Sequence, residues 1–305
     1  MSVVFTHELR ARGVGASAVR RMVRADELYR IRRGAFSTTA PATAVARHRQ
    51  LITSTLPGLA PDTIVSHVSA AVLHGLPVTA RHLAKVTVTR PGNGGGHITP
   101  YLHQYRTPLP EQDVLALDGV RRTSLARTVV DLARCGELAA AVAAADAALR
   151  RGATDAQLRA QLSGARRRRG LAQARTVVDL ADPLSESWGE SMSRVALSWL
   201  GLPPPELQYE VCVDGITYRV DFAWPEFDVL GEFDGKVKHG ELLKSGMTAA
   251  DAVMRENQRD AALGSLGWTV VHWVHADVSH PERLARLLRP ALVPRRGEPA
   301  RRTSA

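Results

Sequence analysis

Three acidic residues in the last third of the chain have a spacing that could hold a metal ion. Asp221 lies within the apolar run 220–224, and Glu232 and Asp234 lie two residues apart in a later apolar run. Because the side chains of a strand alternate, Glu232 and Asp234 should project to the same face. Asp221 should come alongside them if the two runs pair as strands. Converging carboxylates repel one another unless a cation neutralises them. The pattern therefore predicts a site for Mg²⁺ or Mn²⁺, which prefer oxygen ligands.

A divalent cation held in this way would activate water and stabilise the charge that develops on a phosphate during hydrolysis. Basic residues follow the acidic pair directly: Lys236, Lys238 and His239. These side chains are candidates for polarising the nucleophile or for holding the scissile phosphate. The alternative interpretation is that the first acid caps a strand end and that the acidic pair belongs to an ordinary turn. Isolated acids within apolar strands favour the metal site.

The elements that must position these acids alternate between helix and strand. A helix opened by residues 185–190 runs to Leu200 and ends at Gly201. Three strands, one helix and one further strand follow, over residues 209–213, 218–224, 228–233, 248–266 and 268–274. Asp214-Gly215 is a favourable hairpin turn between the first two strands. The predicted order is helix, three-stranded meander, helix and strand, with acidic side chains at the strand ends.

The stretch VDFAWPEFDVLGEFDGKVKHG, together with the later ENQRD and LGWTVVHW, resembles a known group of nucleases. Over residues 182–290 the chain is similar to the very-short-patch-repair-like endonucleases of the PD-(D/E)XK superfamily. The resemblance implies a mixed central sheet flanked by helices and a metal-dependent DNA endonuclease activity.

The resemblance also implies roles for individual residues. Asp221 would be the first acid of the motif, Glu232 and Asp234 the acidic pair, and Glu190 (or Glu186) the glutamate of the helix. Lys236, Lys238 or His239 would supply the basic group. The lysine of the family follows its second acid after one residue, but that position after Glu232 holds Asp234. Asp234-Gly235-Lys236 restores the pattern two residues later, so the register of the catalytic lysine stays open.

The first 60 residues predict a DNA-binding domain. Residues 7–12 predict a short helix, Ser17 is the expected cap of a second helix that ends at Asp26, and residues 28–36 predict a hairpin with Gly34 near its tip. This order is that of a winged helix-turn-helix, whose second helix docks in the major groove of DNA. Six arginines are its candidate phosphate contacts: Arg20, Arg21 and Arg24 on the helix, and Arg30, Arg32 and Arg33 on the wing. The alternative is a solvated basic face on a small helical cap.

Residues 61–165 predict an α/β scaffold without chemistry. A small-residue helix at 69–77, a strand at 86–89, a glycine-rich hairpin turn at 92–96 and two helices at 123–134 and 137–150 are expected. The histidines of this segment lack metal-ligand spacing and are assigned structural or surface roles. Through RRMVRADELYRIRRGAF and SHVSAAVLHGLP, residues 1–150 resemble, more loosely, AbiEi-type antitoxins of type IV toxin–antitoxin systems. That resemblance implies a winged-helix repressor with a cognate toxin as partner.

The composition agrees with a nucleic-acid partner. The 305 residues include 40 Lys and Arg against 30 Asp and Glu, a net charge of +10. Two cysteines without metal-ligand spacing, and the absence of a long apolar run, predict a soluble cytoplasmic protein with no membrane partner. Residues 166–181 begin with four consecutive arginines and predict a charged linker, or a further phosphate contact, with a helix that begins near residue 171. Residues 291–305 predict a disordered basic tail.

The sequence thus predicts an α/β (α+β) protein and leaves two hypotheses for its function. The first is a metal-dependent DNA endonuclease, in repair or defence, that is targeted by its winged helix. The second is a transcriptional regulator of antitoxin type whose nuclease-like domain has lost its activity. The DNA sequence recognised and the choice between a monomer and a homodimer stay open.

Overall fold

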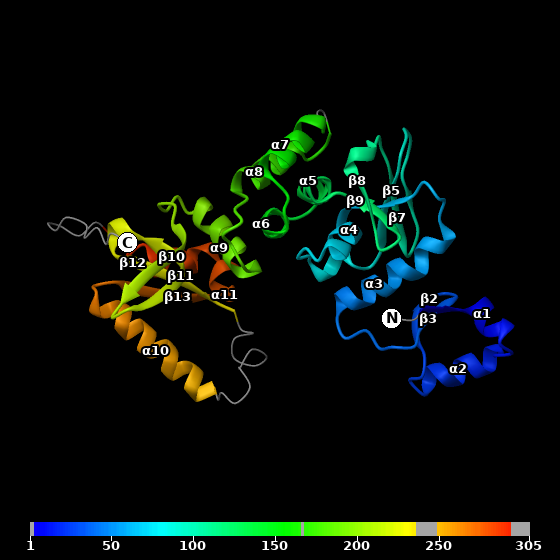
Figure 1. Ribbon diagram of the computed structural model, residues 1–305, viewed down its shortest axis with the longest axis horizontal. Coiled ribbons are helices and arrows are strands. Elements are labelled where there is room, and N and C mark those ends of the chain that lie inside the picture. Colours follow the sequence, from blue (N-terminus) through cyan, green and yellow to red (C-terminus); the bar gives the residue numbers. More distant parts are fainter. Residues whose placement is uncertain (1–2, 166–167, 236–248, 294–305) are drawn as a thin grey trace. The chain divides into compact units, whose positions relative to one another are not determined.

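The computed structural model describes residues 3–165, 168–235 and 249–293, and it divides the chain into two compact units, Met1–Asp179 and Leu180–Ala305 (Figure 1). Both units combine helices with sheets, so the chain belongs to the α+β class. The unit boundary lies close to residue 182, where the nuclease-like segment was predicted to begin. Within the described ranges, no helix has the length and apolar character needed to span a bilayer.

The first unit begins with a small sheet and two helices. Its elements are β1 (Val3–Phe5), α1 (Thr6–Ala11), α2 (Ala16–Arg24), β2 (Tyr29–Arg32) and β3 (Ala35–Ser37), and the strands pair antiparallel in the order β1-β3-β2. The predicted order of two helices and a hairpin is confirmed, with Gly34 in the left-handed region at the hairpin turn. The predicted cap was wrong: Gly15 precedes α2 in extended conformation, and Ser17 lies inside the helix.

The rest of the first unit is built on a six-stranded sheet with the order β6-β7-β5-β4-β9-β8. Its strands are β4 (Ile64–Val65), β5 (Val86–Arg90), β6 (His97–Ile98), β7 (Leu102–Arg106), β8 (Val114–Leu117) and β9 (Val120–Thr123). Its helices are α3 (Ala44–Thr55), α4 (His67–His74), α5 (Leu125–Cys135), α6 (Leu138–Arg150), α7 (Asp155–Gly164) and α8 (Leu171–Leu180). Short 3-10 turns occur at Leu56–Gly58, Ala80–His82 and Glu111–Asp113.

The glycine run at 92–96 does not form the hairpin that the sequence predicts. Strands β5 and β7 pair parallel, and the antiparallel partner of β7 is the two-residue strand β6. A Cβ atom added at Gly96 would lie 2.6 Å from the carbonyl oxygen of Gln104, so the backbone approaches β7 too closely for a side chain. The run therefore connects β5 to β6, and residues 99–101 then lead into β7.

The second unit has the predicted order of helix, meander, helix and strand. Its elements are α9 (Trp188–Trp199), β10 (Glu206–Val213), β11 (Ile216–Trp224), a 3-10 turn (Pro225–Phe227), β12 (Val229–Asp234), α10 (Ala249–Ser265), β13 (Thr269–Val274), α11 (His275–Val278) and α12 (Pro281–Leu288). The sheet order is β10-β11-β12-β13, in which the first three strands pair antiparallel and β13 runs parallel to β12.

Helices cover both faces of this sheet (Figure 1). On one face, Leu263 of α10 packs with Val220 and Leu230. On the other face, residues of α9, α11 and α12 pack around Phe222 and Trp273. The long apolar strands of this unit are explained by burial on both sides, and their few acidic residues stand out against that background.

Gly189 allows α9 to pack closely against β12, next to the predicted helix glutamate Glu190. A Cβ atom added there would overlap the ring of Phe233. We therefore expect Gly189→Ala to lower the free energy of unfolding of this unit by about 1–3 kcal/mol, the usual cost of overpacking. Gly264→Ala is the matched control, because Gly264 also lies in a helix but has no atom within 4 Å of an added Cβ.

That control should be neutral or stabilising, since alanine is the better helix former. Chemical denaturation followed by tryptophan fluorescence measures the difference specifically in this unit, because all five tryptophans lie at residue 188 or later. Equal stability of the two variants would contradict the close packing of α9 on β12.

Candidate functional site

Glu232 and Asp234 project to the same face of β12, as the sequence predicts. Glu232 is buried and its Oε1 accepts a hydrogen bond of 2.5 Å from Nη2 of Arg259, which lies in α10. The same nitrogen donates to the carbonyl oxygen of Arg219 at 2.6 Å. Arg259 therefore neutralises the buried Glu232 and ties β11 to α10.

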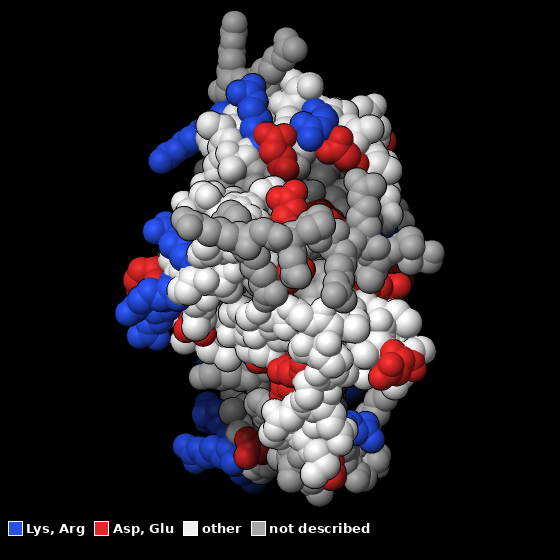
Figure 2. Space-filling view, turned by 90° about the vertical axis from the view of Figure 1, so that its left-hand side faces the viewer, with Lys and Arg blue, Asp and Glu red and all other residues white. Residues whose placement is uncertain are grey.

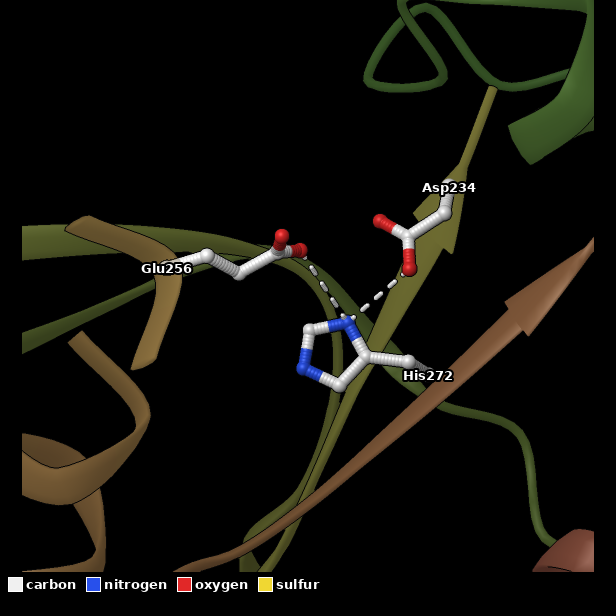
Figure 3. A group of neighbouring side chains, drawn as sticks. All are labelled: Asp234, Glu256 and His272. Atoms are coloured by element: carbon white, nitrogen blue, oxygen red, sulfur yellow. Dashed lines mark hydrogen bonds and ion pairs between the residues drawn. The ribbon is translucent and has the colours of Figure 1, made fainter. Parts of the chain in front are cut away.

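Asp234 belongs to a cluster of charged side chains around His272 of β13 (Figure 3). Nδ1 of His272 lies 3.2 Å from Asp234 and 3.7 Å from Glu256, and Nε2 lies 2.9 Å from Asp260. The hydrogen bond to Asp234, followed by the charge of Asp260, raises the pKa of His272 to about 9. At neutral pH the ring is an imidazolium, and both of its nitrogens donate hydrogen bonds.

Ligand atoms of Asp234, Glu256 and His272 lie within 4.8 Å of one another, so this trio has the composition of a metal site. An imidazolium has no lone pair with which to bind a metal. A metal ion would therefore have to displace the proton that the carboxylates stabilise on His272. In its present arrangement the cluster is an ion-pair network that links β12, β13 and α10.

Asp221 reaches β12 between the two acids of the pair. The pairing of β11 with β12 ends at Phe222 and Gly231. Beyond that point, Oδ2 of Asp221 accepts a hydrogen bond of 3.0 Å from the backbone N–H of Phe233. The carboxylate thus accepts the hydrogen bond that a backbone carbonyl oxygen of β11 would accept if the strand pairing continued. Asp221 comes alongside Glu232 and Asp234, as predicted.

The other oxygen of Asp221 faces a second carboxylate, that of Glu190. The side-chain amide of Gln208 lies 3.1 Å from Glu190 Oε2 and 3.5 Å from Asp221 Oδ1, so it bridges the two acids. Glu190 Oε2 also accepts a hydrogen bond from the backbone N–H of Glu186 at 2.7 Å. Burial, followed by the negative charge of Asp221, raises the pKa of Glu190 above its ordinary value. Two carboxylates therefore converge where α9 meets the end of the β11–β12 ladder.

The three predicted metal ligands do not form one set among the described residues. Asp221 faces Glu190 across Gln208, whereas Glu232 pairs with Arg259 and Asp234 with His272. In Figure 2, acidic side chains (red) are spread over the face in view, and basic ones (blue) lie mostly at its top and along its left edge. The alternative helix glutamate, Glu186, is paired with Arg219 at the surface. Lys236, Lys238 and His239 lie outside the described residues.

Sequence reasoning missed five side chains that organise this site, among them Gln208, which bridges Glu190 and Asp221. Glu256, Arg259 and Asp260 lie in the stretch ENQRD, which was noted for its resemblance but given no role. His272 lies in the stretch LGWTVVHW, which was treated in the same way. Glu256 and Asp260 are four residues apart and so share one face of a helix, and this spacing is the signal that could have found them.

Five of the six arginines predicted to contact DNA are exposed on the first unit: Arg20, Arg21, Arg24, Arg30 and Arg33. Arg32 differs. Its guanidinium donates to the carbonyl oxygens of Arg33 and Ser54, so it ties the β2–β3 hairpin to α3 and is only partly exposed. The prediction of Arg32 as a phosphate contact is therefore replaced by a structural role.

Comparison with known proteins finds uncharacterized relatives. The chain is 36% identical over 172 residues to "Uncharacterized protein MT2308" of Mycobacterium tuberculosis strain CDC 1551 / Oshkosh, and equally to "Uncharacterized protein Rv2248" of strain ATCC 25618 / H37Rv. The match covers 55% of this chain and 60% of each relative. No family model matches the chain. The crystal structure of the RV2827C protein from Mycobacterium tuberculosis is similar over 59% of this chain and 72% of that one, with 18% identity and a TM-score of 0.39.

Proposed function

We propose that the second unit is a divalent-metal-dependent nuclease that hydrolyses phosphodiester bonds of DNA, and that the first unit holds the duplex. The observation that carries the proposal is the convergence of Glu190 and Asp221 at the end of the β11–β12 ladder, bridged by Gln208. The mixed sheet flanked by helices in this unit supports it, since the resemblance to PD-(D/E)XK endonucleases implies the same architecture.

The residues of this site fit a divalent cation. Carboxylate oxygens are hard donors, and Mg²⁺ is commonly bound by one or two of them together with water and phosphate. Burial and, after it, repulsion from Asp221 raise the pKa of Glu190, and a cation between the two acids would relieve that repulsion. Asp221 and Glu190 would hold Mg²⁺ or Mn²⁺, with Asp234 as a further candidate ligand. The bound ion would activate water and neutralise charge on the phosphate.

The neighbouring residues of the chain keep the carboxylates in place. Gln208 orients Glu190 and Asp221 together, and the backbone N–H of Phe233 fixes the side-chain torsion of Asp221. Arg259 neutralises Glu232, which limits the negative charge that the DNA backbone would meet. We propose Lys236, Lys238 or His239 as the group that positions the attacking water or the scissile phosphate.

The first unit is proposed to bind the duplex as a winged helix-turn-helix. The exposed arginines of α2 would neutralise phosphates on either side of the major groove, and Arg30 and Arg33 of the hairpin would extend the contact. A protein that acts on chromosomal or invading DNA would work in the cytoplasm.

Metal binding is expected to raise the thermal stability of the second unit. A ligand that binds only the folded state at 100 times its dissociation constant adds about 2.7 kcal/mol. Mg²⁺ or Mn²⁺ should therefore raise the Tm measured by tryptophan fluorescence by several degrees in the wild type. Asp221→Asn should abolish this shift, whereas Glu226→Gln, an exposed acid of the same unit, should keep it. An identical shift in both variants would place the ion elsewhere.

A second candidate function is a DNA-binding regulator of antitoxin type that acts with a cognate toxin. The observation that favours it is the internal neutralisation of the acidic pair, since Arg259 holds Glu232 and protonated His272 holds Asp234. In that case the nuclease-like unit would serve as a binding module without hydrolytic activity. Cleavage of DNA by the wild type separates the two functions.

A further inference from the structure

The first unit contains a cavity in the segment that the sequence predicts to be a scaffold without chemistry. Its volume is about 310 Å³, at the lower end of the range of small-molecule sites. The floor is one face of the sheet, where Thr87 of β5 lies beside His103 and Tyr105 of β7. The start of α4, the segment before β5, the end of α5 and the start of α6 form the walls.

Three aromatic rings are stacked along this cavity. The ring of Tyr105 lies 3.8 Å from that of His67, at an interplanar angle of 11°, and 4.1 Å from that of His103, at 26°. The three rings thus form a ladder of nearly parallel planes. Such a ladder is a platform for a further flat ring, because stacking on aromatic side chains is favourable for every nucleic-acid base.

His67 is held in place at a cost in backbone energy. It is 6% exposed, and its φ of +50° places it in the left-handed region that residues other than glycine rarely adopt. Its Nδ1 lies 3.0 Å from Oγ of Ser66, which in turn accepts a hydrogen bond from Thr89. Strained residues of this kind cluster at binding and catalytic sites. The backbone conformation and the contact with Ser66 thus fix the position of the His67 ring at the cavity.

Charged groups of both signs reach the same cavity. Burial, followed by the positive charge of nearby Lys85, lowers the pKa of His103. Arg81, paired with Glu137, contributes a second cation to the wall. The buried carboxylate of Asp131, which pairs with Arg127 and Arg134, also lines the cavity. An anionic group is favoured at Lys85, and a hydrogen-bond donor is favoured at Asp131.

We propose that this cavity binds a nucleoside monophosphate, with its base stacked on the ring ladder and its phosphate at Lys85. A base has a flat ring that would stack on the ring ladder. It also has N–H groups that would donate hydrogen bonds to Asp131. The phosphate supplies the negative charge, and the size of a mononucleotide agrees with the volume. This site is separate from the proposed nuclease site, since every residue that lines it lies in the first unit.

The two cysteines of the chain provide the test. Cys135 lines the cavity, whereas Cys212 lies on β10 of the other unit, and both are exposed. The full-length protein is treated with N-ethylmaleimide in the presence of AMP, GMP, CMP or UMP, and modification of each cysteine is followed by mass spectrometry. We expect at least one nucleotide to slow the modification of Cys135 by about fivefold or more at saturation, and none to change the rate at Cys212.

Calorimetry with the protecting nucleotide then tests the contacts. His103→Ala should weaken binding about tenfold through loss of one stacked ring, and Lys85→Ala should weaken it to a similar extent. Arg106→Ala, an exposed cation outside the cavity, should leave it unchanged. Circular dichroism melts that match the wild type show that the variants fold.

Three outcomes would overturn the proposal. The first is the absence of protection at Cys135 by any of the four nucleotides at about 5 millimolar, which is several thousand times a dissociation constant of about 1 micromolar. The second is binding that leaves Cys135 unprotected, since this would place the nucleotide at another site, such as the arginines of α2. The third is equal protection by inorganic phosphate, which would reduce the cavity to an anion site.

Discussion

Replacement of Asp221 by alanine is expected to abolish DNA cleavage and to leave DNA binding intact or stronger. Asp221 is the only one of the three predicted acids whose described contacts combine a backbone anchor, the N–H of Phe233, with a facing carboxylate, that of Glu190. Its loss removes one of the two carboxylates that are proposed to hold the metal, the other being that of Glu190. Groups that stabilise transition-state charge typically contribute 10²–10³-fold or more to the rate. The loss of a negative charge also reduces repulsion of the phosphate backbone.

The experiment measures cleavage and binding on the same DNA. Single-turnover cleavage of a labelled duplex with Mn²⁺ gives the rate, and fluorescence anisotropy with Ca²⁺ in place of Mn²⁺ gives the affinity. Glu226→Ala is the matched control, since it removes an exposed acid of the same unit. Cleavage by the Asp221 variant within about tenfold of the wild type would remove this residue from the proposed catalytic role.

Simultaneous replacement of Arg20, Arg21 and Arg24 by alanine is expected to weaken duplex binding tenfold or more. All three side chains are exposed on α2, the proposed second helix of the helix-turn-helix. Each lost phosphate contact removes about 1 kcal/mol and lowers the slope of log affinity against log salt by about 0.9. The triple variant should therefore lose both affinity and salt dependence, with little change in the preference among DNA sequences.

A triple variant of equal charge provides the control. Arg106, Arg150 and Arg159 are exposed in the same unit but lie on other elements, so their replacement by alanine should change binding much less. Anisotropy titrations over a range of salt concentrations measure both variants. Equal losses would indicate that the net charge of the chain, rather than α2, determines the affinity.

Local sequence patterns were sufficient to predict the second unit and the strand positions of its acids. The apolar runs around Asp221 and Glu232 have strand length and turn residues at their ends, and alternation within β12 requires that Glu232 and Asp234 share a face. The contacts of Arg259 and His272 confirm that face. The strand positions and the shared face depend only on residues close together in the chain, so a single sequence is enough to predict them.

The remaining features depend on contacts between distant segments or on unusual backbone angles. Gln208 of β10 bridges the carboxylates of Glu190 and Asp221, and its φ is +53°. Nothing in the residue type of a glutamine indicates this left-handed backbone conformation. The high pKa of His272 requires acids from β12 and α10 to meet β13. Likewise, the ring ladder of the first unit arises because β7 places Tyr105 beside His67, 38 positions earlier in the sequence. None of these arrangements produces a periodic pattern of residue types in the sequence from which it could be predicted.

Incubation of the wild-type protein with DNA and divalent cations tests the central claim most directly. Supercoiled plasmid, nicked and mismatched duplexes and single strands are each treated with Mg²⁺ or Mn²⁺, beside samples with EDTA and with the Asp221→Ala variant. We predict that at least one of these DNA forms is cleaved by the wild type, that EDTA prevents cleavage, and that the variant binds the same DNA without cutting it. If the wild type leaves every form intact with both ions while it still binds duplex DNA, the nuclease proposal is wrong, and the carboxylates belong to an inactive module of a DNA-binding regulator.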